Sequence, residues 1–220
     1  EPKTMATYRS DSDRSQSIMD WLQTNSKVLG IGAAVVVVAA AFYWFYTRSI
    51  QIKAENAERS LLTAQQSLAS GNAGLARSDL QKVIDRYGGT SAGSEAALLL
   101  AQLDYEQSKF QDGINVLKKE ANGGAPGPNL SSIYSLTADG SSQLGKPAEA
   151  AKQYQRAADA TSYPNEKAYQ LAKAARAFAT AGDTAQARKL WSSLATDSKA
   201  QAVAAEARVR LAELDAKPAG

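Results

Sequence analysis

Chemistry in this chain would have to come from carboxylates, hydroxyls and amines, because the sequence contains neither histidine nor cysteine. That composition excludes thiol catalysis, Ser-His-Asp catalysis, disulfides and zinc sites of the usual Cys/His kind. The acidic residues Glu95, Asp104, Glu149 and Asp183 stand singly in predicted helices or turns, a pattern typical of solvated faces. We therefore expect no catalytic residue and no enzyme activity.

Two glycine-rich stretches, GNAG at residues 71–74 and GGAPG at 123–127, are the candidates for a phosphate-binding loop. Neither is followed by a Lys-Ser/Thr pair, and neither follows a predicted strand. We therefore expect no cofactor and no metal. The formal net charge is only +3, and Lys and Arg are interspersed with Asp and Glu without a block of five like charges. No basic face for nucleic acid is predicted.

An uncharged run of twenty residues separates Lys27 from Arg48. As a helix rising 1.5 Å per residue it would be about 30 Å long, which matches the hydrocarbon thickness of a bilayer. A buried core helix rarely lacks a polar face over such a length, and a signal peptide ends in small residues. This run instead ends in five aromatic residues typical of a membrane interface, namely Phe42, Tyr43, Trp44, Phe45 and Tyr46. The sequence thus predicts one membrane span over residues 28–47.

Two segments precede the predicted span. Residues 1–16 are polar and rich in Ser and Asp, which predicts disorder. Residues 17–27 mix apolar and polar side chains in the pattern of an amphipathic helix, with Trp21 at the membrane interface. The same residues could also be a simple helical extension of the span, and the sequence leaves both alternatives open.

The rest of the chain repeats an eleven-residue phrase at a spacing of 37 residues. The four copies are SGNAGLARSDL (70–80), QSKFQDGINVL (107–117), LGKPAEAAKQY (144–154) and AGDTAQARKLW (181–191). Each copy has a small turn residue, a small residue five positions later and a large residue four positions after that. The turn residues are Gly71, Ser108, Gly145 and Gly182; the small ones are Ala76, Gly113, Ala150 and Ala187; the large ones are Leu80, Leu117, Tyr154 and Trp191. A fixed period of this size indicates stacked helical repeats.

Each phrase is expected to join the two helices of a hairpin. A Gly can take the left-handed conformation that ends a first helix, and the small residue lets a second helix pack closely against it. The large residue, one turn further along the same face, fills the remaining space. We therefore predict that Tyr154 and Trp191 are buried. Residues 202–216 have the spacing of the capping helix that closes a helical solenoid.

The unit AYQLAKAARAFATAGDTAQARKLWSSLA (residues 168–195) resembles a tetratricopeptide repeat. Six residues fall where that family places its small, aromatic and turn residues: Ala175, Phe178, Gly182, Asp183, Ala187 and Trp191. The unit containing GKPAEAAKQYQRAA matches through its second helix. The first two units depart from the pattern, because Ser108 replaces Gly and Gly113 replaces Ala. The expected fold is all-α, with one transmembrane helix followed by a tetratricopeptide-like solenoid of about four helix pairs and a capping helix over residues 48–220.

The whole chain resembles the ancillary SecYEG translocon subunit (YfgM-like) family, through MDWLQTNSKVLGIGAAVVVV, FYWFYTRS and the repeat turns. The resemblance implies a cytoplasmic N-terminus and a periplasmic repeat domain at a bacterial inner membrane. It also implies a larger integral membrane complex as partner, with secretory polypeptides or periplasmic chaperones as further partners. Charge alone does not orient the span, because three cations lie near it on each side.

The first helices of such repeats line a groove that binds extended or helical peptides. The repeat register predicts six groove residues: Gln65, Gln102, Tyr105, Asp139, Tyr169 and Arg176. Two functions remain open. One is an interaction module that brings secretory chains or chaperones to a membrane complex. The other is a permanent accessory subunit that stabilises a larger assembly, such as a translocon, respiratory or photosynthetic complex. An open polar groove would favour the first, and a strongly apolar patch the second.

Overall fold

The computed structural model describes residues 19–216, and all regular structure in that range is helical. The chain divides into two compact units, one ending at Ile52 and the other beginning at Lys53. Helix α2 (Ser26–Ala69) contributes residues to both units. An apolar N-terminal helix followed by a helical repeat domain confirms the predicted fold class. The expected segment boundaries stay predictions, and the disorder predicted for residues 1–16 lies outside the described residues.

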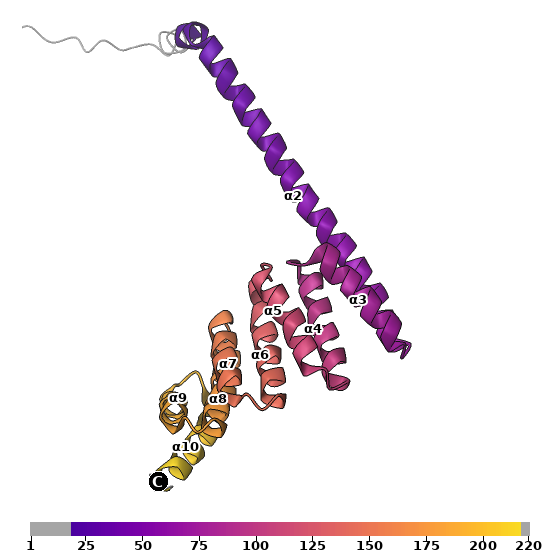
Figure 1. Ribbon diagram of the computed structural model, residues 1–220. Helices are drawn as coiled ribbons and strands as arrows, with labels where there is room; N and C mark the ends of the chain where they lie inside the picture. Colours follow the sequence, from indigo (N-terminus) through magenta and orange to yellow (C-terminus); the bar gives the residue numbers. More distant parts are fainter. Residues whose placement is uncertain (1–18, 217–220) are drawn as a thin grey trace, which may run out of the picture. The chain divides into compact units, whose positions relative to one another are not determined.

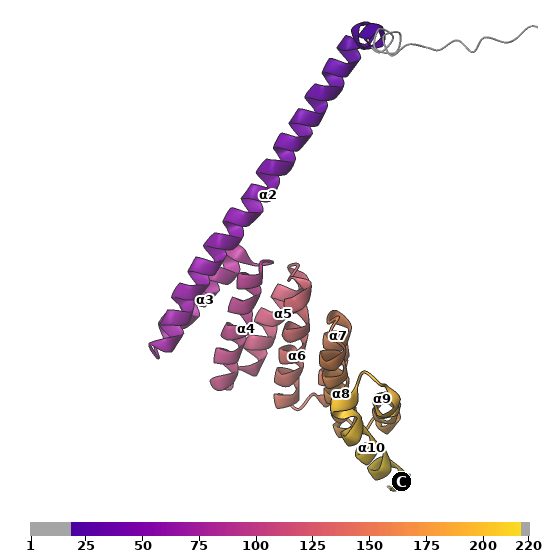
Figure 2. The same ribbon diagram turned by 180° about the vertical axis from the view of Figure 1, so that it is seen from behind.

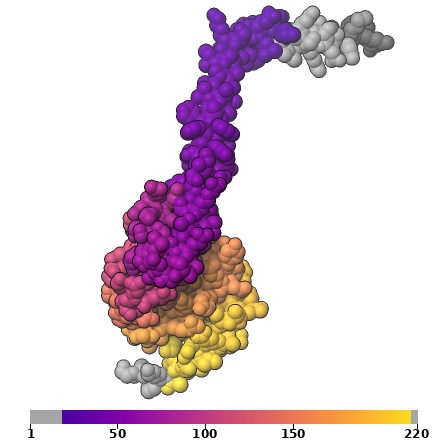
Figure 3. Space-filling model, turned by 90° about the vertical axis from the view of Figure 1, so that its right-hand side faces the viewer, coloured from indigo at the N-terminus to yellow at the C-terminus, as the bar shows by residue number. Residues whose placement is uncertain are grey.

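The described part of the first unit, residues 19–52, is helical except at Asn25, and its large apolar side chains are exposed. Residues 19–24 are helical, Asn25 is a turn residue, and α2 then begins at Ser26. The length and composition of α2 are sufficient to cross a membrane, and no residue of its most apolar stretch is buried. The five aromatic side chains of residues 42–46 are each at least 65% exposed. With 3.6 residues per turn, five consecutive side chains surround the helix on all sides. The space-filling view shows the indigo N-terminal helix as a stretch with its surface open on the face seen (Figure 3).

The second unit is a succession of antiparallel helix pairs (Figures 1 and 2). After the end of α2 come α3 (Ala73–Tyr87), α4 (Ser91–Glu106), α5 (Phe110–Asn122), α6 (Gly127–Gln143), α7 (Pro147–Ala160), α8 (Pro164–Thr180), α9 (Thr184–Thr196) and α10 (Gln201–Ala216). Helices α4, α6 and α8 are the first helices of their hairpins, and α5, α7 and α9 are the second helices. The closing helix α10 packs against both α8 and α9, as a cap does.

The predicted turn positions all have left-handed backbone conformations. The φ angle is +74° at Gly71, +59° at Ser108, +69° at Gly145 and +83° at Gly182. In the last three turns the following amide also donates to a carbonyl five residues earlier, as from Asp183 to Phe178 at 2.9 Å. These bonds satisfy carbonyls that the end of a helix leaves without a partner. Among the described residues, Ser108 is the only non-glycine residue with a positive φ.

The core consists of three clusters of buried apolar side chains. One joins α2, α3 and α4 around Leu61, Leu80 and Leu100. A small central cluster has only Ala101, Leu117 and Ile133 as its buried members. The largest extends from α6 to α10 and includes Tyr154 and Trp191, which are 6% and 1% exposed. The predicted burial of these two aromatic residues is therefore confirmed.

One expectation about the acidic residues is wrong. Asp104 lies in the core with 0% exposure, and its Oδ1 accepts a hydrogen bond from the guanidinium of Arg77 in α3. Position 104 belongs to the face of α4 that packs against α3, and the cation makes its carboxylate tolerable there. The partner stands 27 residues away in the sequence, so local spacing does not reveal the pair.

Candidate functional site

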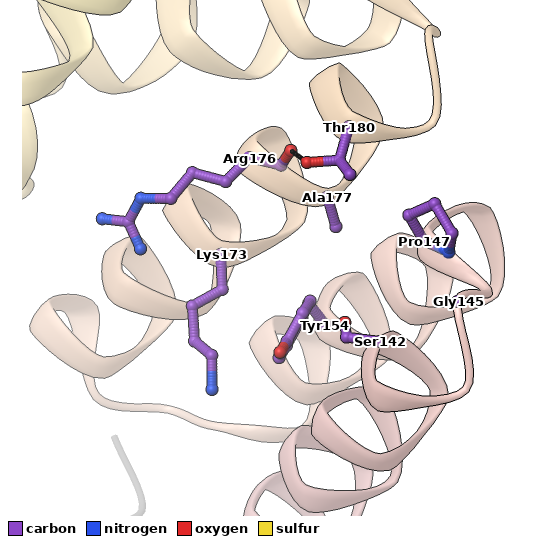
Figure 4. Close-up of a pocket in the computed structure, with 8 residues that line it drawn as sticks. All are labelled: Ser142, Gly145, Pro147, Tyr154, Lys173, Arg176, Ala177 and Thr180. Carbon is purple, nitrogen blue, oxygen red and sulfur yellow. Dashed lines mark hydrogen bonds between the residues drawn. The ribbon is translucent and has the colours of Figure 1, made fainter.

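Two cavities open beside α8 in the last two repeats. The cavity between α8 and the preceding hairpin, here called cavity A, has a volume of about 310 Å³ and is lined by Ser142, Gly145, Pro147, Tyr154, Lys173, Arg176, Ala177 and Thr180 (Figure 4). Cavity B, between α8 and the helices α9 and α10, has a volume of about 390 Å³ and is lined by Arg176, Ala179, Thr180, Trp191, Arg210, Glu213 and Leu214. Arg176 and Thr180 line both cavities and form a ridge between them.

The two cavities occupy equivalent positions of successive repeats. A shift of 37 residues carries five residues of cavity A onto five of cavity B: Ser142 onto Ala179, Tyr154 onto Trp191, Lys173 onto Arg210, Arg176 onto Glu213 and Ala177 onto Leu214. Each cavity thus has an aromatic residue from a second helix as its floor and a long cation from a first helix or the cap at its edge. The 37-residue period therefore places the same kind of cavity in two successive repeats.

The same position one repeat earlier is filled by a side chain. Tyr105 stands where cavity A has Ser142, and its hydroxyl donates to the carbonyl of Leu136 at 3.1 Å. A methyl group added at Gly140 would lie 2.2 Å from the Tyr105 hydroxyl, and one added at Gly113 would lie 2.5 Å from its ring. The ring therefore occupies the space that these two glycines leave. Burial raises the pKa of Tyr105, and the nearby carboxylates of Asp139 and Asp104 raise it further, so the hydroxyl stays a donor.

Lys173 is the centre of a polar network at the edge of cavity A. Its Nζ lies 2.8 Å from the Asp139 carboxylate and 4.5 Å from the centre of the Tyr154 ring. The Tyr154 hydroxyl donates to the same carboxylate oxygen of Asp139. Burial raises the pKa of Tyr154, and this hydrogen bond raises it further. The network holds the lysine ammonium over an aromatic ring on the wall of the cavity, where cation–π attraction stabilises it.

Arg176 is fixed by a two-pronged ion pair with the cap. Its Nε donates to Glu206 Oε1 at 2.7 Å, and its Nη2 donates to Glu206 Oε2. This hydrogen bonding lowers the pKa of Glu206 and raises that of Arg176. Because the folded carboxyl has the lower pKa, the pair contributes stability at neutral pH that is lost as the pH falls through that lowered value. Arg210 also approaches Glu206, at 3.8 Å.

The structure brings together three of the six predicted groove residues. Two of them lie beside Lys173: Asp139 binds its ammonium, and the centre of the Tyr169 ring lies 5.9 Å from it. The third, Arg176, lines cavity A together with Lys173. Gln65, on α2, instead donates to Glu95 on α4 at 2.9 Å, away from both cavities. Gln102 is exposed on α4, and Tyr105 fills the space described above. A binding role for each of these residues stays a prediction.

The sequence interpretation missed Lys173, Arg210 and the role of Ser142 and Ala179 as small residues that leave space. A signal for Lys173 was present, because Tyr169, Lys173, Arg176 and Thr180 are spaced four, three and four apart and so share a helix face. No local pattern marks Ser142 and Ala179. Their role follows only from comparison with Tyr105, which occupies the same position of the second repeat. Within residues 19–216, no three acidic side chains gather as metal ligands would.

Comparison with known proteins agrees with this architecture. The family described as "Tetratricopeptide repeat-like domain" matches residues 19–136, and the chain belongs to this family. Among the solved structures, this chain is similar to BtubC (BKLC) from P. vanneervenii, with a TM-score of 0.51 and 13% sequence identity. The similarity covers 74% of this chain and 66% of BtubC, just under two thirds of its length, and it concerns the fold alone. No curated protein matches the chain.

Proposed function

We propose that this chain is a non-catalytic, single-pass membrane protein whose repeats hold a protein partner at a bacterial inner-membrane complex. Membership of the tetratricopeptide repeat-like family supports a role in protein–protein interaction. One N-terminal helix with the length and composition of a membrane span supports a tether. The observation that carries the proposal is the pair of repeat-equivalent cavities, A and B, on which first-helix side chains converge.

The proposed setting follows the resemblance to the ancillary SecYEG translocon subunits. In this setting the N-terminus is cytoplasmic, the repeats are periplasmic, and the partners are the translocon together with secretory chains or periplasmic chaperones. Tethering to a membrane complex raises the effective concentration of the repeats near their partner to the millimolar range, so weak contacts in the cavities become useful.

The surface of the repeat domain favours an interaction module over a permanent subunit. Obligate interfaces are large and apolar. The large apolar side chains that the described repeat domain exposes are instead spread over several elements: Leu62, Leu75, Leu144, Tyr163, Tyr169 and Val209. Scattered single residues of this kind are normal on a monomeric surface.

Co-purification from bacterial membranes in mild detergent tests the proposal. We expect partners that are retained at low salt and released at high salt, as polar contacts predict. Stoichiometric partners that persist through high salt would instead support a permanent structural subunit. A variant whose residues 28–47 are replaced by an unrelated apolar helix separates the tether from the repeats. If that variant retains every partner, the repeats alone carry the contact.

Protease accessibility tests the proposed topology. In spheroplasts, added protease should digest the repeat domain while the membrane is still closed. Digestion only after the membrane has been opened would place the repeats in the cytoplasm and contradict the periplasmic assignment.

A further inference from the structure

The closing helix α10 is apolar on two opposite faces. Its inner face, with Val203, Ala207 and Leu211, packs into the largest core cluster. A second row of apolar residues, here called the outer face of α10, follows at helical spacing, and all of its members are exposed: Ala202, Ala205, Val209, Ala212 and Ala216. The outer face of a cap that ends a solenoid is usually polar. Helix α10, the last helix of the succession in Figure 1, therefore departs from an ordinary cap.

The repeat period assigns this outer face to the side of a first helix that is normally covered. At the positions of Ala205 and Ala212, the three preceding first helices have residues that are at most 4% exposed: Ser94, Ser131, Ala168, Ala101, Ala138 and Ala175. On α10 the same two positions are exposed. Helix α10 thus has the surface of the first helix of a fifth repeat.

In the second repeat, the second helix of the hairpin covers this face. A methyl group added at Gly113 of α5 would lie 3.0 Å from the carbonyl oxygen of Ala101, and Ala101 shares a core cluster with Leu117 of α5. The Ser94 hydroxyl donates to Glu120 of α5 at 2.8 Å. The start of α4 therefore meets the end of α5, and the end of α4 meets its start, as in any antiparallel pair. A helix in the same orientation would cover the outer face of α10.

Arg208 marks one edge of the outer face. Four other charged residues of α10 form ion pairs: Glu206, Arg210, Glu213 and Asp215. Arg208 is exposed and has no such partner within residues 19–216. Its position two repeats earlier is occupied by Tyr134, and the centre of the Tyr134 ring lies 5.2 Å from the guanidinium of Arg156 on α7. A helix that covers α10 as α7 covers α6 would place its equivalent of residue 156 beside Arg208, where a carboxylate would form an ion pair.

Glu213 indicates the large residue of the covering helix. Asp139 occupies the same position two repeats earlier and accepts a hydrogen bond from the Tyr154 hydroxyl of α7. Glu213 binds Arg210 at 2.8 Å through Oε2, and its Oε1 accepts no hydrogen bond within residues 19–216. A tyrosine at the equivalent of position 154 would therefore find an acceptor on α10.

We propose that the outer face of α10, together with Arg208 and Glu213, binds an amphipathic helix of a partner protein, which completes a fifth hairpin. The bound helix has a small residue that packs on Ala212, a Tyr four positions later that donates to Glu213, and a Glu two positions after the Tyr that pairs with Arg208. Continuity with the native hairpin interfaces and complementary charge define this occupant. The inference rests on the proposed function, since it names a kind of partner that the repeats hold.

A second copy of this chain fits the outer face less well. Antiparallel pairing of two α10 helices about Val209 would bring their two Arg208 side chains to the same edge of the interface. Like charges placed together in an interface oppose association. The partner is therefore a different protein, and self-association is one outcome of the test.

Helix α7, residues 147–160, supplies the probe, because it has Ala150 and Tyr154 at the required spacing. The first labelled peptide has this sequence with Arg156→Glu, and the second keeps Arg156. The third combines Arg156→Glu with Tyr154→Ala. Since an isolated helix of 14 residues is marginal in water, all three carry the same hydrocarbon staple between positions 148 and 152, which are exposed in the native helix.

Binding to the full chain in nanodiscs is measured by fluorescence anisotropy. We expect the first peptide to bind most tightly. The second should bind about three- to fivefold more weakly, as the loss of an exposed charge pair allows. The third should bind at least about tenfold more weakly, because aromatic anchors carry a large share of the affinity of an interface. Equal binding of all three peptides would overturn the inference.

A pair of variants at exposed apolar residues tests the location. Val209→Glu introduces a charge at the centre of the outer face and should abolish measurable binding of the first peptide. Leu62→Glu makes the same kind of change at an equally exposed residue of α2 and should leave binding unchanged, since the two side chains are 58% and 57% exposed. Both variants should keep the thermal unfolding midpoint of the parent chain. Unchanged binding in Val209→Glu would place the peptide elsewhere and contradict the proposal.

A charge reversal tests the register. Arg208→Glu should reverse the order of the first two peptides, so that the one that keeps Arg156 binds more tightly. Arg86→Glu makes the same change of net charge on α3 and should leave the order as in the parent chain. The same order in the parent chain and in Arg208→Glu would contradict the predicted pairing.

Two further outcomes are decisive. A dimer of the full chain that Val209→Glu dissociates, measured by mass photometry in nanodiscs or detergent, would make a second copy the occupant and overturn the proposed partner. If no peptide binds while partners still co-purify through the repeats, the inference about α10 fails and the proposed function stands.

Discussion

The second and fourth repeats use the same backbone plan with opposite side-chain chemistry. At the position four residues before the turn, the second repeat buries Asp104, where the fourth buries Phe178. Late in the second helix it buries Glu120, whereas the fourth buries Leu194. Both positions are buried in every repeat, so the period determines which residues are inside but not whether they are apolar.

Each buried carboxylate of the second repeat is tolerated for its own reason. Asp104 is paired with the Arg77 guanidinium. Glu120 accepts hydrogen bonds from the Gly89 amide at 3.0 Å and from the Ser94 hydroxyl at 2.8 Å. Both sets of partners come from other helices or from the turns between them. The second repeat therefore needs hydrogen-bond and ion-pair partners for its two buried carboxylates, whereas the fourth repeat fills the same two positions with apolar side chains that need none.

The contrast extends to the space between repeats. The second repeat combines bulky Tyr105 with its own Gly113 and with Gly140 of the following repeat, and the central cluster has few buried members. The fourth repeat combines small Ala179 with Ala187 and leaves cavity B open. A bulky side chain on one helix is thus compensated by glycines on the helices that face it. Where a small side chain stands in place of the bulky one, a cavity remains.

The largest effect should come from the apolar repeat. Trp191→Ala removes a side chain that is 1% exposed in the largest cluster, and should lower the free energy of unfolding by about 3–5 kcal/mol. Urea unfolding of the full chain in detergent, followed by circular dichroism, measures the loss. Leu117→Ala, at the same position of the second repeat, should cost less because its cluster is smaller. A change below about 1 kcal/mol for Trp191→Ala would contradict its role as the floor of cavity B.

A somewhat smaller effect should come from the buried ion pair of the second repeat. Arg77→Met leaves the Asp104 carboxylate buried without its cation and should cost about 3 kcal/mol. Asp104→Asn should cost less, because the Arg77 side chain is 37% exposed and can be hydrated once its partner is neutral. The same urea unfolding assay applies. Equal losses of unfolding free energy for the two variants would contradict the view that the buried Asp104 carboxylate depends on the ion pair more than the half-exposed Arg77 does.

Crowding around Tyr105 predicts an effect of intermediate size. Gly140→Ala places a methyl group 2.2 Å from the Tyr105 hydroxyl, and overpacking of this kind should cost about 1–3 kcal/mol. In a Tyr105→Ala background the added methyl meets no ring, so its cost should fall sharply. A double-mutant cycle measures this coupling. Additive costs would mean that Tyr105 and Gly140 do not compete for the same space.

The smallest effect concerns the turns. Ser108 adopts a φ of +59°, where Gly182 of the fourth repeat adopts +83°. Ser108→Gly should raise the free energy of unfolding by up to about 1 kcal/mol, because Gly has no Cβ to clash in the left-handed region. The reciprocal change Gly182→Ser should lower it by a similar amount. Opposite signs in the two repeats are the expected result, and a loss in both would show that Ser108 has a further stabilising contact.

Local sequence was sufficient to predict the repeats, their turns and the burial of Tyr154 and Trp191. Those features depend on residues within one hairpin, where helix geometry and the left-handed preference of Gly act over a few positions. The apolar helix was predictable from the sequence for the same reason, because its length and its lack of charged residues are local properties. The repeat register also places Asp139, Tyr169 and Arg176 on first helices. These three of the six predicted groove residues lie around Lys173 and cavity A.

Only the tertiary structure decided how polar residues are satisfied and where space is left. The partners of Asp104 and Glu120 lie 26–31 residues away, on other helices or turns, so no spacing rule within a hairpin identifies them. Cavities A and B arise from the difference in volume between Tyr105 and its counterparts Ser142 and Ala179, measured against residues contributed by the following repeat. Whether a cavity forms depends on the side chains of two facing helices, and the sequence of one helix does not show which residues of another helix will face it.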